Sequence, residues 1–253
     1  MSGKVQGMQS FARSMDVLQE IADAPIPPEF SQLFSESSLT RPTLHRILAA
    51  LEAEGLVEQI AGKRYRLGAR VVMLARKSLA DNDIRQVARP YLERLRSETG
   101  ETVHLAVRSG DCLVYIDKIE SMEIVRMAST IGTRVPFHSS GVGKAYLSAL
   151  GSQDAGALIK GLDMKKITRF TTTSRTKLEA IVQEARRRGF VFDDQENEEG
   201  VVCYGAAICD DTHTPVASVS VSVPLFRHSG GEEFYAKPLC QCVDEIARAA
   251  GYG

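Results

Sequence analysis

Residues suited to holding a small organic acid gather in the C-terminal half of this 253-residue chain. Residues 139–144 read Ser-Ser-Gly-Val-Gly-Lys and open a predicted helix, whose free N–H groups and positive dipole end suit one carboxylate. They are not a phosphate-binding loop, because that loop needs a glycine where His138 stands and a serine or threonine where Ala145 stands. A tight helix entry that binds no ligand remains the alternative.

Two serines and one aspartate add polar groups to this candidate site. Ser220 and Ser222 alternate with valines along a predicted strand, so both hydroxyls lie on one face, which is the solvent face in the simpler alternative. Asp193 and Cys203 flank an acidic run, which we interpret as a solvated loop with at most one side chain turned inward. Together, the helix start, paired hydroxyls and carboxylate predict a pocket for a small hydroxy or keto acid.

A cysteine-dependent hydrolase of small acids is the enzymatic alternative. A histidine base next to Cys203, oriented by Asp193, would activate the thiol as a nucleophile. No local cysteine-enzyme motif accompanies these residues, and the sequence holds no Gly-x-Ser-x-Gly motif for a serine enzyme. The candidate bases are His104, His138 and His213.

Composition narrows the class of protein. Charged residues make up 25% and hydrophobic residues 43% of a chain with net charge -1, which is typical of a globular protein and excludes a uniformly basic one. The five cysteines form no Cys-x-x-Cys pair, and Cys240 and Cys242 face different ways on a predicted helix, so we expect no metal and no cofactor. The chain has neither a signal-peptide core nor an apolar run of about 18 residues, which predicts a cytoplasmic protein without membrane contact.

The candidate site lies on elements whose patterns change along the chain. Residues 103–108 alternate as a half-buried strand does, and residues 112–116 form a continuous apolar strand. This mixed order predicts an α+β sensor domain with an antiparallel sheet over residues 83–253. Its further expected strands are 123–127, 190–192, 201–209 and 215–224, and its expected helices lie near 153–160, 175–188 and 231–250.

Residues 40–67 have the pattern of a different module. Thr40 is placed to cap a helix, Pro42 fits its first turn, and Gly55 suits the left-handed position that ends it. Two short strands, 56–60 and 64–67, follow around a basic tip. This order predicts a winged helix-turn-helix. Four apolar residues recur at helical spacing and predict the buried face of this helix: Leu44, Ile47, Leu48 and Leu51.

The exposed face of this helix carries Arg46 between small alanines, so the backbone can approach a nucleic acid while the guanidinium reaches a base edge or phosphate. Between residues 36 and 77 the chain has eight basic and four acidic side chains, a local charge of +4. Upstream, Phe11, Met15 and two later residues share one face of a helix predicted at 9–23. Downstream, residues 68–80 read as a linker helix, and Asp81-Asn82-Asp83 as the cap of the next helix.

Two regions resemble the IclR family of bacterial transcriptional regulators. The first comprises Ser10-Phe-Ala-Arg13-Ser-Met-Asp-Val-Leu18, Thr40-Arg-Pro-Thr-Leu-His-Arg46 and Arg64-Tyr-Arg-Leu-Gly68. The second is Gly189-x3-Asp193-x2-Glu196-x6-Cys203, followed by Ala206-Ala-Ile-Cys-Asp210. Residues 111–122 and Arg126-Met127 look most like the subgroup that senses 2-keto-3-deoxygluconate.

This resemblance implies a winged helix-turn-helix DNA-binding domain over residues 1–67, a linker helix over 68–82 used in dimerisation, and a GAF-like effector-binding domain over 83–253. It implies dimers, pairing into tetramers on double-stranded operator DNA. The implied effector pocket contains Met127, Val135, Gly141, Val142, Asp193, Cys203, Ser220 and Ser222. The residues expected to contact DNA are Arg13, Thr40, Arg41, Thr43, His45, Arg46, Lys63 and Arg64.

The sequence therefore predicts a ligand-responsive repressor of a catabolic operon, without catalysis, that senses a small keto or sugar acid. We expect the effector to shift the placement of the DNA-binding domains through residues 68–80, which requires different affinities for the two arrangements. The hydrolase remains one alternative. A sensor that acts through protein partners, with its winged helix contacting protein, is the other.

Overall fold

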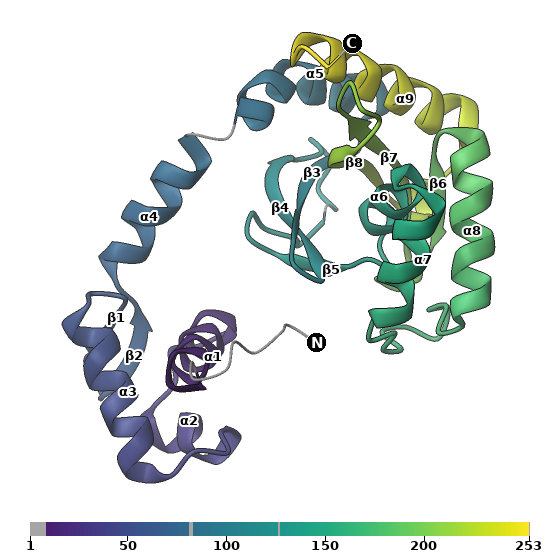
Figure 1. The fold of residues 1–253 in the computed structure, drawn as a ribbon. Helices are drawn as coiled ribbons and strands as arrows, with labels where there is room; N and C mark the ends of the chain where they lie inside the picture. The colour runs from purple at the N-terminus through teal and green to yellow at the C-terminus, as the bar shows by residue number, and fades with distance from the viewer. Residues whose placement is uncertain (1–8, 81–82, 126, 253) are drawn as a thin grey trace. The chain divides into compact units, whose positions relative to one another are not determined.

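The computed structural model describes residues 9–80, 83–125 and 127–252, and it divides into two compact units, one ending at Asp81 and one beginning at Asn82. The predicted cap residues Asp81 and Asn82 and the resemblance at Arg126 lie outside the described residues. Within those ranges, none of the helices has both the length and the apolar character needed to cross a membrane. Figure 1 labels the elements of both units.

The N-terminal unit is a helical domain with a small hairpin, as predicted. Its helix α1 buries Val17 and Ile21, whereas of the predicted face only Leu18 packs partly against the core and Phe11 remains 60% exposed. The reason is that the proline-rich turn after α1 brings α2 and α3 against the Val17 side, where Leu33 and Leu44 complete an apolar core. The elements are α1 (Gln9–Asp23), α2 (Phe30–Glu36), α3 (Arg41–Ala53), β1 (Val57–Ile60), β2 (Arg64–Leu67) and α4 (Ala69–Ala80).

Helix α3 begins and ends where the sequence predicts. Thr40 occupies the N-cap position, but its hydroxyl pairs with the Thr43 hydroxyl at 2.8 Å instead of a backbone N–H. Gly55 takes the left-handed conformation (φ 67°) just after the helix. The predicted buried face of α3 is confirmed, since all four of its apolar residues are buried.

The hairpin of β1 and β2 forms the predicted wing. Its strands pair antiparallel from Val57↔Leu67 to Ile60↔Arg64, and Lys63 stands at the tip in a left-handed conformation (φ 58°). The wing is tied to the helices because the Tyr65 N–H donates to the Pro28 carbonyl at 2.9 Å. This contact holds the basic tip at a fixed place on the N-terminal unit.

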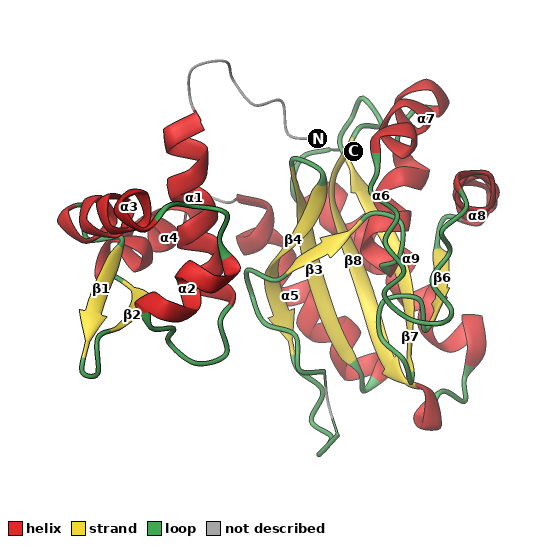
Figure 2. Cartoon of the chain, turned by 90° about the horizontal axis from the view of Figure 1, so that it is seen from below, coloured by secondary structure: helices red, strands yellow, loops and turns green. Residues whose placement is uncertain are grey.

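The C-terminal unit contains a six-stranded antiparallel sheet of order β5-β4-β3-β8-β7-β6 (Figure 2). The expected strand at 123–127 is wrong, because described residues there form bends, and the short strand β5 was not predicted. The elements are α5 (Asp83–Thr99), β3 (Thr102–Ser109), β4 (Cys112–Ile119), β5 (Arg134–Pro136), α6 (Gly141–Ala149), α7 (Ser152–Gly161), α8 (Arg175–Arg188), β6 (Val191–Asp194), β7 (Val201–Cys209), β8 (Pro215–Pro224), the 3-10 turn η1 (Leu225–Arg227) and α9 (Gly231–Ala249).

Helices cover both faces of this sheet. Helices α5 and α9 pack side by side on one face, and α6 packs on the other face with α8 beside it (Figure 1). A bulge in the pairing of β3 with β4 sets Leu105 opposite Asp117 but Ala106 opposite Tyr115. Tyr115 and Asp117 therefore face opposite sides of the sheet, although residues two apart normally share one. Asp117 accepts from Arg89 of α5 at 2.8 Å, while Tyr115 faces the α6 side.

Candidate functional site

A cavity of about 170 Å³ lies in the C-terminal unit, on the sheet face that Tyr115 shares. Of the residues predicted for the effector pocket, five line this cavity: Met127, Val135, Asp193, Cys203 and Ser222. Polar side chains dominate the rest of its wall. The remaining lining residues are His104, Tyr115, Ser129, Thr133, Asn197, Glu198 and Val201.

The other three predicted pocket residues lie beside the cavity rather than along it. Gly141 packs against its wall, since a Cβ on Gly141 would stand 3.1 Å from the Cβ of Cys203. Val142 is buried in the apolar core beneath α6. Ser220 is buried within the sheet, where it pairs with His104 and Gly205.

A chain of hydrogen bonds crosses the cavity wall. The Cys203 thiol donates to the Ser222 hydroxyl at 3.3 Å, and that hydroxyl lies 3.3 Å from Nδ1 of His104. Nε2 of His104 lies 2.7 Å from the Ser129 hydroxyl, and its ring stacks on Tyr115. Burial, aided by the charge of nearby Lys118, lowers the pKa of His104 to about 3. His104 is therefore a neutral hydrogen-bonding group at physiological pH.

The Cys203 thiol in the same wall is a poor nucleophile. Burial and the neighbouring Asp193 raise the pKa of Cys203 to about 12, so the nucleophilic thiolate is scarce near neutral pH. The three candidate bases are not brought together around it. His104 reaches the thiol only through Ser222, His138 pairs with the Lys165 carbonyl, and His213 lies in the turn between β7 and β8.

Lys144 of α6 is buried between two carboxylates. Its Nζ lies 3.1 Å from Oδ1 of Asp193 and 2.5 Å from Oε1 of Glu196, and its side chain is 0% exposed. The prediction of at most one inward residue in the acidic loop is wrong, because Asp193 and Glu196 both turn in. The charge of Lys144 offsets the cost of burying them. The available signal was a lysine within a helix otherwise made of small and apolar residues.

The charges of this cluster follow from its burial. Burial acts to lower the pKa of Lys144, but the two carboxylates outweigh it and raise that pKa, so the ammonium stays charged. Burial raises the pKa of Asp193 to about 6, with Lys144 opposing the shift and Glu196 adding to it. Asp193 is therefore ionised at neutral pH and takes up a proton in mild acid.

The start of α6 is attached to the same wall. The Ser140 side chain accepts from the Gly143 N–H at 3.1 Å, and the Ser139 hydroxyl donates to Asn197 Oδ1 at 3.2 Å. First-turn N–H groups of a helix lack carbonyl partners within it, which leaves those of Gly141 and Val142 to other acceptors. The sheet side is tight here, since a Cβ on Gly205 would stand 2.3 Å from the Gly141 carbonyl oxygen. The predicted helix start thus adjoins the cavity.

His104, Tyr115 and Asn197 line the cavity but were not among the predicted pocket residues. His104 and Tyr115 reach it only through strand register and the β4 bulge, which no local motif reveals. In the described part of the chain, no group of three or more His, Cys, Asp or Glu side chains could hold a metal ion.

The predicted DNA-contacting residues of α3 differ in their surroundings. His45 stacks on Phe30 of α2 with ring centroids 4.0 Å apart, and the Arg41 guanidinium lies 5.4 Å from that ring's centre. Arg46 is exposed and joins none of the ion pairs found among the described residues. Thr40 is exposed and Thr43 half-buried at the helix start. Phe30, which orders two of these side chains, was not foreseen as a supporting residue.

The remaining basic residues are mostly paired. Arg64 lies 3.7 Å from Glu29, and Arg66 and Arg70 form ion pairs with acidic neighbours. Lys63 stays exposed at the wing tip. Arg13 is exposed on α1, one turn before the buried Val17. The positive charge available to an external partner therefore concentrates at α3 and the wing tip.

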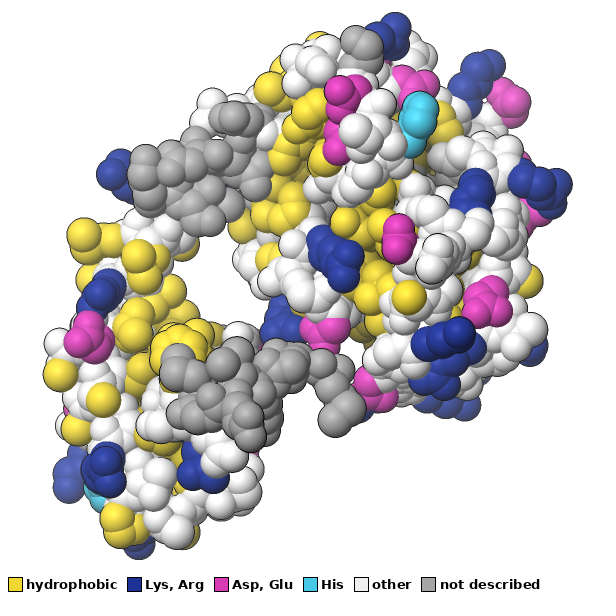
Figure 3. All heavy atoms as spheres, viewed as in Figure 1, with side chains coloured by type: hydrophobic (Ala, Val, Ile, Leu, Met, Phe, Trp, Pro, Cys, Tyr) yellow, Lys and Arg dark blue, Asp and Glu magenta, His cyan; other side chains and the backbone are white. Residues whose placement is uncertain are grey.

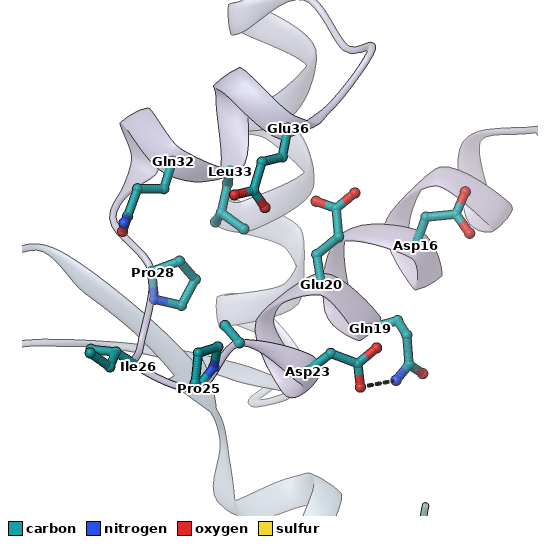
Figure 4. A pocket seen from close by; sticks show the side chains of 11 residues that line it. Asp16, Gln19, Glu20, Asp23, Pro25, Ile26, Pro28, Gln32, Leu33 and Glu36 are labelled. Atoms are coloured by element: carbon teal, nitrogen blue, oxygen red, sulfur yellow. Dashed lines mark hydrogen bonds between the residues drawn. The ribbon is translucent and has the colours of Figure 1, made fainter. Parts of the chain in front are cut away.

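A broad hollow of the N-terminal unit is acidic. A groove of about 820 Å³ runs between α1 and α2, and in Figure 4 the Glu20 and Glu36 carboxylates approach one another across it. Burial, together with the charges of Glu36 and Asp16, raises the pKa of Glu20. Such a groove repels phosphates, which leaves α3 and the wing as the surface suited to nucleic acid.

Comparison with known proteins extends these observations. Residues 10–61 match the family model described as the IclR helix-turn-helix domain, and residues 76–248 match that of the bacterial transcriptional regulator IclR C-terminal domain. The Escherichia coli transcriptional repressor IclR is 30% identical over 223 residues, covering 87% of this chain and 81% of that protein. The Escherichia coli regulator XynR is 30% identical over 247 residues, covering 97% and 98%. The crystal structure of Thermotoga maritima IclR superposes with a TM-score of 0.74 at 29% identity, covering 97% of this chain and 100% of that one.

Proposed function

This chain belongs to the IclR family of transcriptional regulators, and from that premise we propose that it represses a catabolic operon until a hydroxylated small organic acid binds its C-terminal unit. The observation that carries the proposal is a partly open cavity with polar side chains in its wall, which lies in a different unit from α3 and its exposed face. Separate sites for a small molecule and for DNA are what a ligand-controlled repressor requires. Such a protein works in the cytoplasm, where its operator lies.

The proposed DNA contacts centre on Arg46 and the wing. Arg46 is exposed, adjoins small alanines and has the reach to read a base edge in the major groove. His45 and Arg41, ordered by the Phe30 ring, would fix the helix on the backbone with Thr40 and Thr43. Lys63 and Arg64 on the wing, and Arg13 on α1, would contact phosphates.

The proposed effector carries one carboxylate and several hydroxyls, as a sugar acid does. Its carboxylate would lie towards the first-turn N–H groups of Gly141 and Val142. Its hydroxyls would donate to Glu198 and to Oδ2 of Asp193, the oxygen that Lys144 and the Glu196 N–H leave free. A simple keto acid would offer no donor to Glu198 or to this second oxygen of Asp193, which favours the hydroxylated ligand.

We further propose that two copies pair through the linker helix α4 and that dimers join into tetramers on the operator. Three consecutive apolar side chains of α4 are exposed in the single chain: Val72, Met73 and Leu74. Figure 3 displays the hydrophobic side chains gathered over this helix. An exposed apolar helix of this kind is typical of a surface that a second copy covers.

We assign no catalytic role to Cys203. The pKa of the thiol is raised, and His104 is too weak a base to activate it, since its pKa is lowered to about 3 and it reaches the thiol only through Ser222. A hydrolase would show turnover of small esters or acids that disappears in Cys203→Ser, whereas we expect none in either protein.

The central test is capture of genomic DNA fragments by the purified full-length protein, followed by sequencing. We expect one or a few operators to be enriched, and D-gluconate or 2-keto-3-deoxygluconate to release them while neutral glucose does not. Captured fragments that no tested acid releases would refute the effector class but leave DNA binding in place.

A sensor that acts through protein contacts predicts a different outcome. It would retain no DNA at any salt concentration, whereas the proposed repressor should hold DNA with an affinity that falls steeply as salt rises. Fluorescence anisotropy of a labelled fragment at a series of salt concentrations distinguishes the two.

A further inference from the structure

The buried cation beside the effector cavity makes no direct contact with the proposed effector. Lys144 does not line the cavity, yet its ammonium contacts the one cavity carboxylate that is fully buried, Asp193. It also contacts Glu196, which stands outside the cavity lining. A lysine of 0% exposure costs several kcal/mol to bury unless paired. Replacement of all three by apolar residues would remove that cost, which raises the question of what the cluster does.

We propose that Lys144 is a positioning and specificity-determining residue, which holds Asp193 in one orientation and keeps it an ionised acceptor for an effector hydroxyl. The inference rests on the proposed function, because it concerns which ligand group the cavity accepts. It adds a residue that acts on the effector only through Asp193.

The geometry of Asp193 supports this assignment. Its Oδ1 accepts from the Lys144 ammonium at 3.1 Å and from the Glu196 N–H at 3.2 Å. Two donors on one oxygen fix the plane of the carboxylate, and they leave Oδ2 for a further donor such as a ligand hydroxyl. Lys144 itself is fixed because it extends from α6 into the loop after β6, where Glu196 also accepts from the Thr172 N–H at 2.9 Å.

The groups around Asp193 explain why a cation is needed there. The loop after β6 contributes Glu196 and Glu198, β7 contributes Cys203, β4 contributes Tyr115, and β3 contributes the neutral His104. None of these supplies a positive charge, and α6 supplies one through Lys144 alone. Without the ammonium, two buried carboxylates would share the site and at least one would hold a proton. A protonated Asp193 would donate a hydrogen bond instead of accepting one.

The test uses isothermal titration of the full-length protein with D-gluconate as the hydroxylated probe and pyruvate as the probe without hydroxyls, between about pH 5 and pH 8. In the wild type, we expect gluconate affinity to fall as the pH drops through about 6, where Asp193 takes up a proton. Lys144→Met should move this midpoint upward by about one pH unit or more. At neutral pH it should weaken gluconate at least about tenfold, and pyruvate far less.

Glu196→Gln should shift the pH midpoint of gluconate binding in the opposite direction. It also keeps the inference testable if Lys144→Met does not fold. It removes the second carboxylate while leaving the ammonium, so the midpoint should move downward, by about half a pH unit or more. Lys160→Met, which removes an exposed lysine from α7, is the matched control and should change neither midpoint nor affinity. Opposite shifts in the first two variants would support the inference. Unchanged midpoints together with lowered melting temperatures would show a purely structural role and overturn it.

A ligand-free measurement separates this inference from the proposed function. The carboxyl carbon of Asp193, assigned by its loss in Asp193→Asn, can be titrated by NMR in the wild type and in the same variants. If neither probe binds the wild type, the proposed effector class fails, while the shifted or unshifted titration of Asp193 still decides the role of Lys144.

Discussion

The two units of this protein treat charge in opposite ways. In the described N-terminal unit no polar or charged side chain is fully buried, and its core is made of aliphatic residues and one tyrosine. The C-terminal unit buries Lys144, Asp193 and Glu196 beside a neutral histidine, and on the other sheet face Asp117 accepts from Arg89. Both units have well-formed cores, so the difference is not one of packing.

The contrast matches what each unit is proposed to recognise. Exposed charges attract a highly charged polymer over several ångströms, and salt screens them. Buried charges are screened little, but their protonation depends strongly on their surroundings, so they respond to pH and to the hydrogen-bonding groups of a small ligand. The DNA-contacting unit should therefore be sensitive to salt and the effector unit to pH.

The largest expected effect tests whether the two cores are independent. Leu44 is 0% exposed in the N-terminal core, and truncation of such a leucine costs about 2–5 kcal/mol. We expect Leu44→Ala to lower one calorimetric transition and to abolish DNA binding, while gluconate binding stays unchanged. Leu67→Ala, at a 37% exposed position on the wing, should have a smaller effect. If both transitions fell together, the separation of the two units would be wrong.

The second effect concerns pH. The folded-state pKa of His104, lowered to about 3, lies below its ordinary value of 6.5, so His104 contributes stability above pH 6.5 that is lost as the pH falls towards 3. Asp193 has the opposite effect. Its pKa is raised from 3.8 to about 6, so the stability that it contributes to the folded protein in acid is lost as the pH rises through 6. Between about pH 4 and 6 the two oppose each other.

Replacement of His104 removes its contribution to the pH dependence of stability, so the opposite contribution of Asp193 should become visible. We expect His104→Gln to lose stability relative to the wild type as the pH rises from about 4 to 6.5, by on the order of 3 kcal/mol in urea unfolding of the C-terminal unit. His213→Gln, in the β7–β8 turn, is the control. Parallel curves for His104→Gln and the wild type would mean that His104 titrates normally.

The same contrast explains how much the sequence could predict. Helix α3, its caps and its buried face follow from residues close together in the chain, and α8, β7 and β8 have the predicted bounds. The α1 face was mispredicted because two apolar stripes compete on that helix. Only the packing of α2 and α3 decides that Val17, not Phe11, is buried.

The cavity was predictable only in part. Asp193, Cys203 and Ser222 were identified from the family resemblance and strand alternation, and all three line it. Lys144 and Glu196 were missed because their pairing joins positions 52 residues apart, and a charge run in a loop normally lies in solvent. Local patterns predict elements well, whereas buried ion pairs depend on the tertiary arrangement.

A smaller effect should separate base reading from backbone attraction within the N-terminal unit. Arg46→Ala should cost about 1–3 kcal/mol at the operator and much less on non-specific DNA, because a base contact is lost. Competition anisotropy with operator and scrambled duplexes measures both. Arg66 lies on the wing but is paired with Glu58, so Arg66→Ala should change neither the operator affinity nor the non-specific affinity greatly. Equal losses on both duplexes for Arg46→Ala would instead make Arg46 a phosphate contact.

The smallest expected effect is at the wing tip. Lys63 is exposed, and among the described residues it forms no ion pair, so its charge is available to a single phosphate. Lys63→Ala should weaken all DNA sequences about equally and lower the slope of log affinity against log salt by about 1. Lys63→Arg should keep the slope, since it keeps the charge. The same salt series with gluconate should give a much flatter line for the C-terminal unit, because Lys144 and Asp193 are buried and salt screens buried charges little. A gluconate affinity as salt-dependent as DNA binding would contradict the contrast between the two units.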